Sequence, residues 1–291
     1  MRVPSCNDGA VFRRNGNRFA AASILAASLL LSVSGSGASF AQIDLSSTVT
    51  ELSKESENPV SQVMTIPLRY QADFKEGAYD ATKQSFELSQ AVVPFALGDD
   101  WSLITRTKLP MTSEPPSSRG ASWEFGLGNG YTTFFLSPSH GEGLFWGAGP
   151  VLYYPASSHP LGVERWGAGP SAAFLKKDNG PWVLGVVVNN IWSFGTDQFG
   201  RRTDELLVNP FLAYHFGDGW SLGTSPNITA DWVSKPGQRW TVPLGGGISK
   251  TLSVGALALK FSLDAYANAA RPEWQHDPWQ LQSTLTFLFP E

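Results

Sequence analysis

The stretch "ALALKFSLDAYAN", residues 256–268, alternates apolar and polar side chains along its whole length. Leu257, Leu259, Phe261 and Leu263 fall on one side of an extended chain, and the residues from 260 onward on the other side are mostly hydrophilic. A period of two is that of a β-strand, because successive side chains point to opposite faces. This segment therefore predicts a strand with one apolar face and one polar face.

The same alternation continues through the chain from residue 65 onward, where helical periodicity is hard to find. It predicts twelve strands, at about 65–74, 85–95, 101–109, 123–136, 144–154, 166–175, 182–194, 204–216, 220–232, 239–250, 256–268 and 279–289. Tight turns such as "GDG" (217–219) alternate with longer loops such as "ASSHPLGVE" (156–164). Turns on one side and longer loops on the other are typical of an outer-membrane β-barrel whose two chain ends lie in the periplasm.

The tryptophans distinguish this barrel from a soluble β-sandwich, whose strands also alternate. Trp182 and Trp192 lie at the two ends of one predicted strand, and ten residues tilted by about 40° span roughly 25 Å, the height of an apolar band between two aromatic girdles. A soluble core gives no reason for Trp at both ends. We therefore predict an all-β fold, a transmembrane antiparallel up-and-down β-barrel of about twelve strands. Its membrane-interface girdle is predicted to contain Trp101, Trp146, Trp166, Trp182, Trp192, Trp220, Trp232, Trp240 and Trp279.

The pentapeptide "WGAGP" occurs twice, at 146–150 and 166–170, at the starts of two successive predicted strands. Successive strands run in opposite directions, so Trp146 is expected at the periplasmic membrane surface and Trp166 at the outer one. The glycines are expected to face inward and to relieve crowding or permit bending. Chance reuse of a good strand opener also explains the repeat.

The first 41 residues predict a cleaved signal peptide. A basic leader precedes an apolar stretch from Phe19 to Val33, and Ser39 and Ala41 supply a small-residue cleavage site. The apolar run is too short to favour a membrane anchor. Residues 42–64 are predicted to form a periplasmic N-terminal segment, and residues 65–291 the outer-membrane barrel.

Asn58 and Pro59 suit the start of a helix, with Asn58 as the cap and Pro59 in the first position. A short periplasmic helix here would partly close the mouth of the barrel. A disordered leader fits the same residues equally well.

Composition excludes several partners and sites. The chain has one cysteine, Cys6, within the predicted leader, so the mature chain has no disulfide and no thiol nucleophile. Without the leader there remain 17 basic and 24 acidic residues, a net charge of −7. This charge argues against nucleic acid as a partner, because phosphate binding needs a basic face.

Several motifs resemble a family of proteobacterial outer-membrane proteins labelled "transporter" or, misleadingly, "neuromedin U". They include "NPVSQVMTIPL" (58–68), "DWSLITRTKLP" (100–110), "SPNITADW" (225–232) and "RWTVPLGGGISK" (239–250), and the similarity covers nearly all of the mature chain. The resemblance implies a β-barrel proposed to pass small solutes. It supplies no catalytic residue and no substrate to carry over.

The chain end, "FLFP" followed by Glu291, resembles the aromatic-terminated strand that the barrel-assembly machinery reads, although Pro290 and Glu291 follow Phe289. The expected partners are thus outer-membrane lipid, that machinery during biogenesis and small solutes. The expected location is the outer membrane of a Gram-negative bacterium.

The alternation also predicts which side chains line the interior. The pore-lining candidates are Arg69, Asp73, Glu87, Arg106, Lys108, Glu124, Glu205, Asn209, His215, Asp231, Arg239, Lys260 and Asp264. A wet lumen that passes small solutes would use these charges to shape the electrostatics of passage. A polar plug, in which arginines pair with carboxylates and nothing crosses, fits the same residues. A twelve-stranded barrel is narrower than a sixteen-stranded porin, so both interpretations stay open.

An outer-membrane hydrolase would need a nucleophile beside a histidine that a carboxylate or amide orients. The chain has four histidines, and His140, His159 and His276 lie in predicted turns or loops. His215 is expected at the periplasmic rim, in contact with water or headgroups. Four scattered histidines without cysteine predict no zinc site, and the glycine-rich strands lack phosphate-loop spacing. We expect no cofactor and no enzymatic activity, and the loops carry no repeat that would suggest an adhesive surface protein.

Overall fold

Strands dominate the described part of the chain, as the alternation predicts. The computed structural model describes residues 49–76, 81–114, 122–141, 143–155, 165–177, 179–196, 200, 202–254, 257–273, 275 and 278–290, and the predicted signal peptide lies outside them. The strands are β1 (Met64–Glu76), β2 (Ala81–Ala96), β3 (Trp101–Glu114), β4 (Glu124–Leu127), β5 (Gly130–Pro138), β6 (Leu144–Tyr154), β7 (Gly167–Lys177), β8 (Trp182–Ser193), β9 (Asp204–Gly217), β10 (Trp220–Thr224), β11 (Ile228–Asp231), β12 (Trp240–Val254), β13 (Leu257–Ala270) and β14 (Trp279–Phe289).

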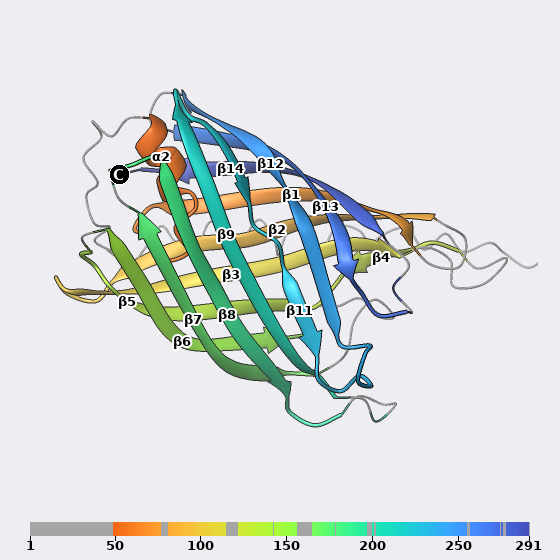
Figure 1. Cartoon of the computed structure of the whole chain (residues 1–291). Coiled ribbons are helices and arrows are strands. Elements are labelled where there is room, and N and C mark those ends of the chain that lie inside the picture. The colour runs from red at the N-terminus through yellow and green to blue at the C-terminus, as the bar shows by residue number, and fades with distance from the viewer. Residues whose placement is uncertain are drawn as a thin grey trace, which may run out of the picture. The chain divides into compact units, whose positions relative to one another are not determined.

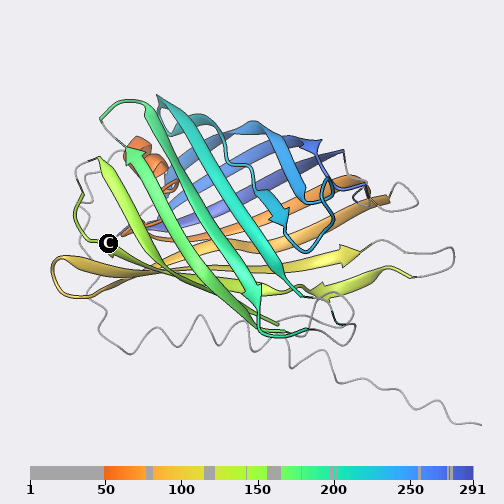
Figure 2. The ribbon, with the colours of Figure 1, turned by 60° about the horizontal axis from the view of Figure 1, so that its bottom comes forward.

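These elements form one closed antiparallel barrel of twelve strands. Breaks at 128–129 and 225–227 divide two of the barrel strands into β4 with β5 and β10 with β11. Each barrel strand pairs with its neighbours in sequence, and β1 pairs with β14 from Met64 opposite Phe289 to Phe74 opposite Trp279. Figures 1 and 2 show the steeply tilted strands of this closed sheet. Closure leaves no long unpaired edge.

The two ends of the barrel differ. The end at which β1 begins and β14 finishes carries the tight connections 97–100 and 218–219, and we call it the turn end. The opposite end, the loop end, carries longer connections such as 155–166 and 232–239. This division agrees with the spacing of turns and loops in the sequence.

Side-chain exposure follows the predicted alternation along β13. Phe261 is 55% exposed, whereas its neighbour Lys260 is only 8% exposed. Phe261 and Leu263 therefore face outward, and Lys260 and Tyr266 face the enclosed interior. The exposed apolar side chains lie on nearly every strand, as expected of a surface that contacts lipid.

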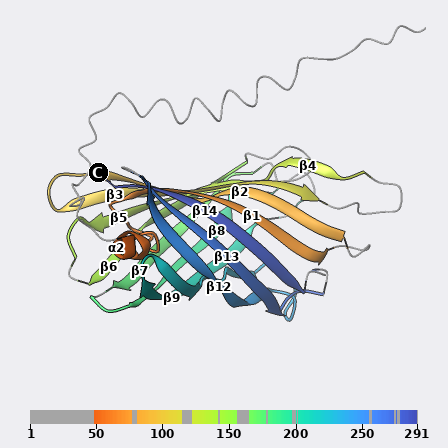
Figure 3. The same cartoon turned by 90° about the horizontal axis from the view of Figure 1, so that it is seen from above.

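Residues 49–63, which we call the N-terminal segment, occupy the turn end. The segment begins with helix α2 (Val49–Glu55), which contacts β9, β10, β12 and β13. Figure 3 shows α2 among the strand ends. Figures 1 and 3 show the helix at the end of the barrel where β14 finishes.

The predicted helix start at Asn58 is wrong, since the helix lies before it and residues 59–63 are not helical. The Asn58 Nδ2 donates to Glu55 Oε1 at 2.9 Å, and its Oδ1 accepts from the Val60 backbone N–H at 3.0 Å. Asn58 thus builds the turn that follows the helix. The same short polar side chain favours both positions, because it can hydrogen-bond backbone N–H groups in either.

Part of the barrel interior is an apolar core. Val60 of the N-terminal segment packs with inward-facing side chains of β2, β3, β5, β7, β8 and β9. This core contains Val60, Val92, Ile104, Phe135, Ala173, Leu175, Val183, Val187, Phe211 and Ala213. A second cluster joins Leu52 and Val63 to Ala258 of β13 and Leu288 of β14. The interior near the turn end is thus tightly packed, with polar side chains such as Ser102 and His215 buried beside the apolar core.

The repeated glycines lie where strands or the N-terminal segment approach closely. A Cβ at Gly147 would come within 2.8 Å of Val60 Cγ1 and 3.0 Å of Phe135 Cβ. A Cβ at Gly149 or Gly169 would overlap a backbone carbonyl of the neighbouring strand. The first "WGAGP" therefore makes room for Val60, and the alternating glycines permit close strand approach.

Candidate functional site

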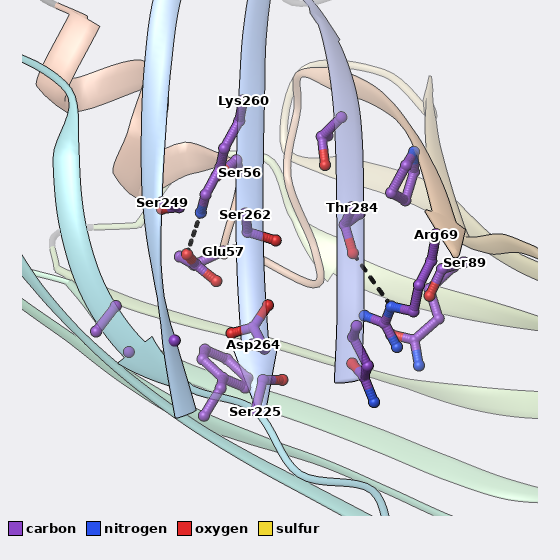
Figure 4. Close-up of a pocket in the computed structure, with 18 of the residues that line it drawn as sticks. Ser56, Glu57, Arg69, Ser89, Ser225, Ser249, Lys260, Ser262, Asp264 and Thr284 are labelled. Carbon is purple, nitrogen blue, oxygen red and sulfur yellow. Dashed lines mark hydrogen bonds and ion pairs between the residues drawn. The ribbon is translucent and has the colours of Figure 1, made fainter. Parts of the chain in front are cut away.

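A polar cavity lies above the N-terminal segment. Its floor is formed by residues Ser56, Glu57, Asn58 and Pro59, and its walls come from β1, β2, β3, β9, β10, β12, β13 and β14. We call it the lumen cavity. Figure 4 shows Arg69 and Ser89 on one side and Asp264 on another. Hydroxyl, amide and charged groups dominate the lining.

Two cations beside the lumen cavity share one carboxylate. Glu87 of β2 forms ion pairs with Arg69 of β1 at 3.4 Å and with Lys108 of β3 at 3.1 Å. The Arg69 Nε also donates to Thr284 Oγ1 of β14 at 3.3 Å. Adjacent strands place these side chains together because Arg69 is the register partner of Glu87. The alternation predicted that all three charged residues face inward, but it did not predict their pairing.

Arg106 lines the lumen cavity and is held by a β-bulge. Its Nη2 donates to Gln90 Oε1. Gln90 has a φ of 62°, and the β2–β3 register shifts between Leu88 and Ala91 at this point. A bulge adds one residue and re-aims its side chain, so both Ser89 and Gln90 reach the cavity.

The opposite wall is joined to the floor by an ion pair. Lys260 of β13 pairs with Glu57 and donates to Ser56 Oγ at 3.0 Å. A second ion pair, between Lys177 of β7 and Glu55 at 2.6 Å, ties down the other side of the segment. Both carboxylates belong to the N-terminal segment, so its attachment to the barrel is electrostatic as well as apolar.

Asn209 and His215 both lie inside the barrel on β9. The Asn209 Nδ2 donates to Ser225 Oγ at 3.0 Å and to the Pro226 carbonyl at 2.9 Å, which holds the break between β10 and β11. His215 is only 4% exposed, so the expected rim position in contact with water is wrong. Helix α2 of the N-terminal segment contacts β9.

The remaining polar candidates lie toward the loop end. Asp73 is buried and accepts from Gln71 Nε2 at 2.8 Å. Glu205 and Asp231 are register partners on β9 and β11. Asp231 also accepts from the Val233 N–H and the Ser234 hydroxyl. Asp231 therefore helps to shape the loop that follows it.

Of the thirteen candidates, five line the lumen cavity, namely Arg69, Arg106, Asn209, Lys260 and Asp264. Glu124 and Arg239 are among the eight that do not. Glu124 is exposed on β4, which pairs with β3 alone at the loop end (Figure 1). Arg239 donates through Nε to the Ser234 carbonyl at 2.9 Å, and its guanidinium lies 6.0 Å from the Trp232 ring. Both are loop-end residues, and Arg239 has a structural contact there.

The nine tryptophans of the predicted girdle are all exposed. They fall at both ends of the barrel, as Trp101 and Trp146 show at the turn end, where their rings meet edge to face at 6.1 Å. Trp232 and Trp240 make a similar pair at the loop end, at 5.7 Å. The outer surface therefore carries aromatic residues at each end of its apolar strands.

Sequence reasoning missed the floor of the cavity and the Gln90 bulge. Residues 42–64 carry no strong periodicity, so Glu55, Glu57 and Val60 had no predicted partners. The bulge leaves one signal in the sequence, since "SQAVV" (89–93) breaks the period of two. A break of this kind shows that the alternation is interrupted but not which side chain turns inward.

No family model matches the chain, and no curated protein is similar to it in sequence. Among solved structures, an outer-membrane channel from Pseudomonas putida F1 is 17% identical, with a TM-score of 0.60 over 78% of this chain and 95% of that one. The fold is that of an outer-membrane β-barrel. The NanC porin, 8% identical, gives a TM-score of 0.48 over 78% of this chain and 98% of that chain. The resemblance of the motifs to the "transporter" family stays a prediction.

Other kinds of site find little support in the described residues. They contain no group of three or more His, Cys, Asp or Glu side chains that could hold a metal ion. Within the same residues no helix has the length and apolar character needed to cross a membrane. Both ring nitrogens of His215 are buried, and neither has a hydrogen-bond partner among the described side chains.

Proposed function

We propose that this protein is an outer-membrane channel for small hydrophilic solutes, closed at its turn end by the N-terminal segment. The observation that carries the proposal is the lumen cavity, a hydrophilic space inside a closed barrel whose floor is a separate stretch of chain. A barrel wall cannot open without losing strand pairing, whereas a segment held by side-chain contacts can leave. Passage would then need displacement of the floor and no change in the barrel.

The outer surface supports a place in the membrane. Apolar side chains cover it, and tryptophans lie at both of its ends, where their amphipathic rings suit headgroups. We place the turn end in the periplasm, because short turns face that side in barrels of this kind. Outer-membrane lipid and, during biogenesis, the barrel-assembly machinery are the partners we propose.

A channel fits the interior better than an enzyme or a sealed polar plug. The histidine that a hydrolase would use, His215, makes no hydrogen bond within the described part of the chain. The ion pairs of the lumen line the wall or hold the floor and leave free space between them. That space is what a polar plug would have to fill.

The proposal can be tested with a reversible disulfide between the N-terminal segment and the barrel wall. The distance of 2.8 Å between Val60 Cγ1 and a Cβ at position 147 is close to the separation of about 3 Å between a Cβ and the far sulfur of a disulfide. The double variant Val60→Cys/Gly147→Cys should therefore cross-link the segment to β6. In planar bilayers the oxidised protein should not conduct, and reduction should restore channel openings.

The two single variants are the matched controls, and their conductance should not respond to oxidation. Equal conductance of the oxidised and reduced double variant would show that the segment is not the barrier. If neither form conducts, and proteoliposomes of the unaltered mature protein do not swell in small solutes, the channel proposal itself fails.

A further inference from the structure

One guanidinium in the lumen has no carboxylate partner. Arg106 donates to the Gln90 amide oxygen, but its buried Nε has no hydrogen-bond partner, and it forms no ion pair with any described carboxylate. A second cation, Arg69, lines the same cavity. An unpaired guanidinium in a cavity wall that holds a second cation attracts an anion.

The other cations near Arg106 have carboxylate partners. Arg69 and Lys108 share the carboxylate of Glu87, at 3.4 and 3.1 Å. Lys260 pairs with Glu57 of the floor. Among the described cations that line the lumen cavity, Arg106 is therefore the one that no carboxylate pairs.

The bulge at Gln90 brings a second polar group to the same place. Gln90 adopts the left-handed backbone region, which a residue with a side chain seldom occupies without a local reason. Because its Oε1 accepts from Arg106, its amide nitrogen is left as a donor at the cavity wall. The strained bulge thus places a donor beside the unpaired guanidinium.

We propose that Arg106, Gln90 and Arg69 form a binding subsite for the carboxylate of a small hydrophilic organic anion inside the lumen. This assignment rests on the proposed function as a solute channel and names the class of solute. The planar guanidinium matches a carboxylate with two parallel hydrogen bonds, and a single unpaired cation suits a single negative charge. The hydroxyl groups that line the rest of the cavity suit a hydroxylated body, and they include Ser89, Ser225, Ser262, Tyr266 and Thr284.

The subsite and the floor share one space, because Arg106 and residues Ser56 to Pro59 line the same cavity. A solute bound at Arg106 would stand above the floor, next to the side chains that hold it. Binding weak enough to permit release is what conduction needs.

The test is calorimetric titration of the full mature protein in detergent with gluconate, a hydroxylated monocarboxylate. We expect binding that Arg106→Gln weakens about tenfold or more, because a charge-assisted hydrogen-bonded pair is lost. Gln90→Glu should abolish binding as well, because it gives Arg106 a carboxylate of its own. This second variant adds an ion pair, so loss of binding cannot be ascribed to an unpaired buried group.

The matched control is Arg202→Gln, which removes an exposed arginine at the loop end and should leave gluconate affinity unchanged. Absence of gluconate binding, or equal binding by Arg106→Gln, overturns the assignment. Binding of inorganic phosphate in place of gluconate does so too, since it indicates a general oxyanion site.

The calorimetric result is independent of conduction. Gluconate binding without any channel conductance in bilayers would support the subsite and overturn the proposed channel. Conductance with no gluconate binding would keep the channel and overturn the subsite.

Discussion

The interior of this barrel has two regions, one near the turn end and one in the middle, and they differ although the same strands wall both. Near the turn end, Val60 of the N-terminal segment meets Ile104, Phe135 and Leu175 in a packed apolar core. Further along β3, Arg106 lines the hydrophilic lumen cavity. Two residues of one strand separate a packed interior from an open one.

The difference shows what alternation means in a barrel. A period of two determines which side chains point inward, but it does not determine what they meet there. Where another piece of chain enters, apolar inward residues bury surface, and the contact contributes about 25 cal/mol for each Å² removed from water. Where no other segment enters, the inward polar residues must form hydrogen bonds or ion pairs with water or with one another.

The largest expected effect distinguishes the interior from the outer surface. Phe135 is 0% exposed inside the turn end, and its neighbour Leu136 is 44% exposed on the outside. Phe135→Ala should lower the free energy of unfolding by about 3–5 kcal/mol, because it leaves a cavity in a packed core. Leu136→Ala should cost much less, since lipid chains can fill the space. Urea unfolding in lipid vesicles measures both, and equal losses would mean that the core does not stabilise the barrel.

The next effect tests the fit between Val60 and the barrel. Gly147→Leu places a side chain where a Cβ alone comes within 2.8 Å of Val60 Cγ1. Overpacking of this kind costs about 3 kcal/mol, and release of the segment avoids that cost. We expect more frequent channel openings in bilayer recordings. Ala148→Leu, on the exposed side of the same strand, is the control, and similar behaviour of the two variants would contradict the fit.

A smaller effect concerns the ion pair between the floor and the wall. Glu57→Gln leaves Lys260 without its carboxylate and should weaken attachment of the segment by about 2 kcal/mol. Channel openings should become more frequent in bilayer recordings, and raising the salt concentration should increase openings less than it does in the unaltered protein. Glu114→Gln breaks the Lys83 pair at the loop end, at 2.6 Å, and should leave openings unchanged. If both variants open equally often, the Glu57–Lys260 ion pair does not hold the N-terminal segment in place.

The smallest effect lies on the outer surface at the turn end. Trp101 and Trp146 meet edge to face, and such pairs are worth about 1 kcal/mol beyond their buried area. A double-mutant cycle with Trp101→Ala and Trp146→Ala should give a coupling energy of that size in unfolding experiments. Trp101 and Trp192, at opposite ends of the barrel, should show additive losses. Coupling between the distant pair would mean that the effect is not local.

Most of the fold could be predicted from the sequence, because each strand shows its own period and its own bounding turns. The predicted strands 144–154 and 279–289 agree with β6 and β14 at both ends. The predicted 220–232 strand is interrupted at residues 225–227, since Asn209 from another strand holds the break. Local pattern cannot show an interaction between strands of that kind.

The interior could be predicted only in part. Arg69, Arg106, Lys260 and Asp264 line the lumen cavity, which agrees with their position on the polar face of each strand. Glu124 and Arg239 were placed by the same alternation, but their strands extend past the wall into the loop end. Which carboxylate neutralises which cation depends on the register between strands and on the floor, and neither can be read from one strand alone.

The second apolar cluster links two events in the assembly of the molecule. Leu52 and Val63 pack on Ala258 and Leu288, and Leu288 is the register partner of Thr65, where the first strand pairs with the last. The surface that receives Leu52 and Val63 therefore exists only after β1 has paired with β14. Binding of the N-terminal segment should stabilise this pairing, which should be weakest in molecules whose segment has left the barrel.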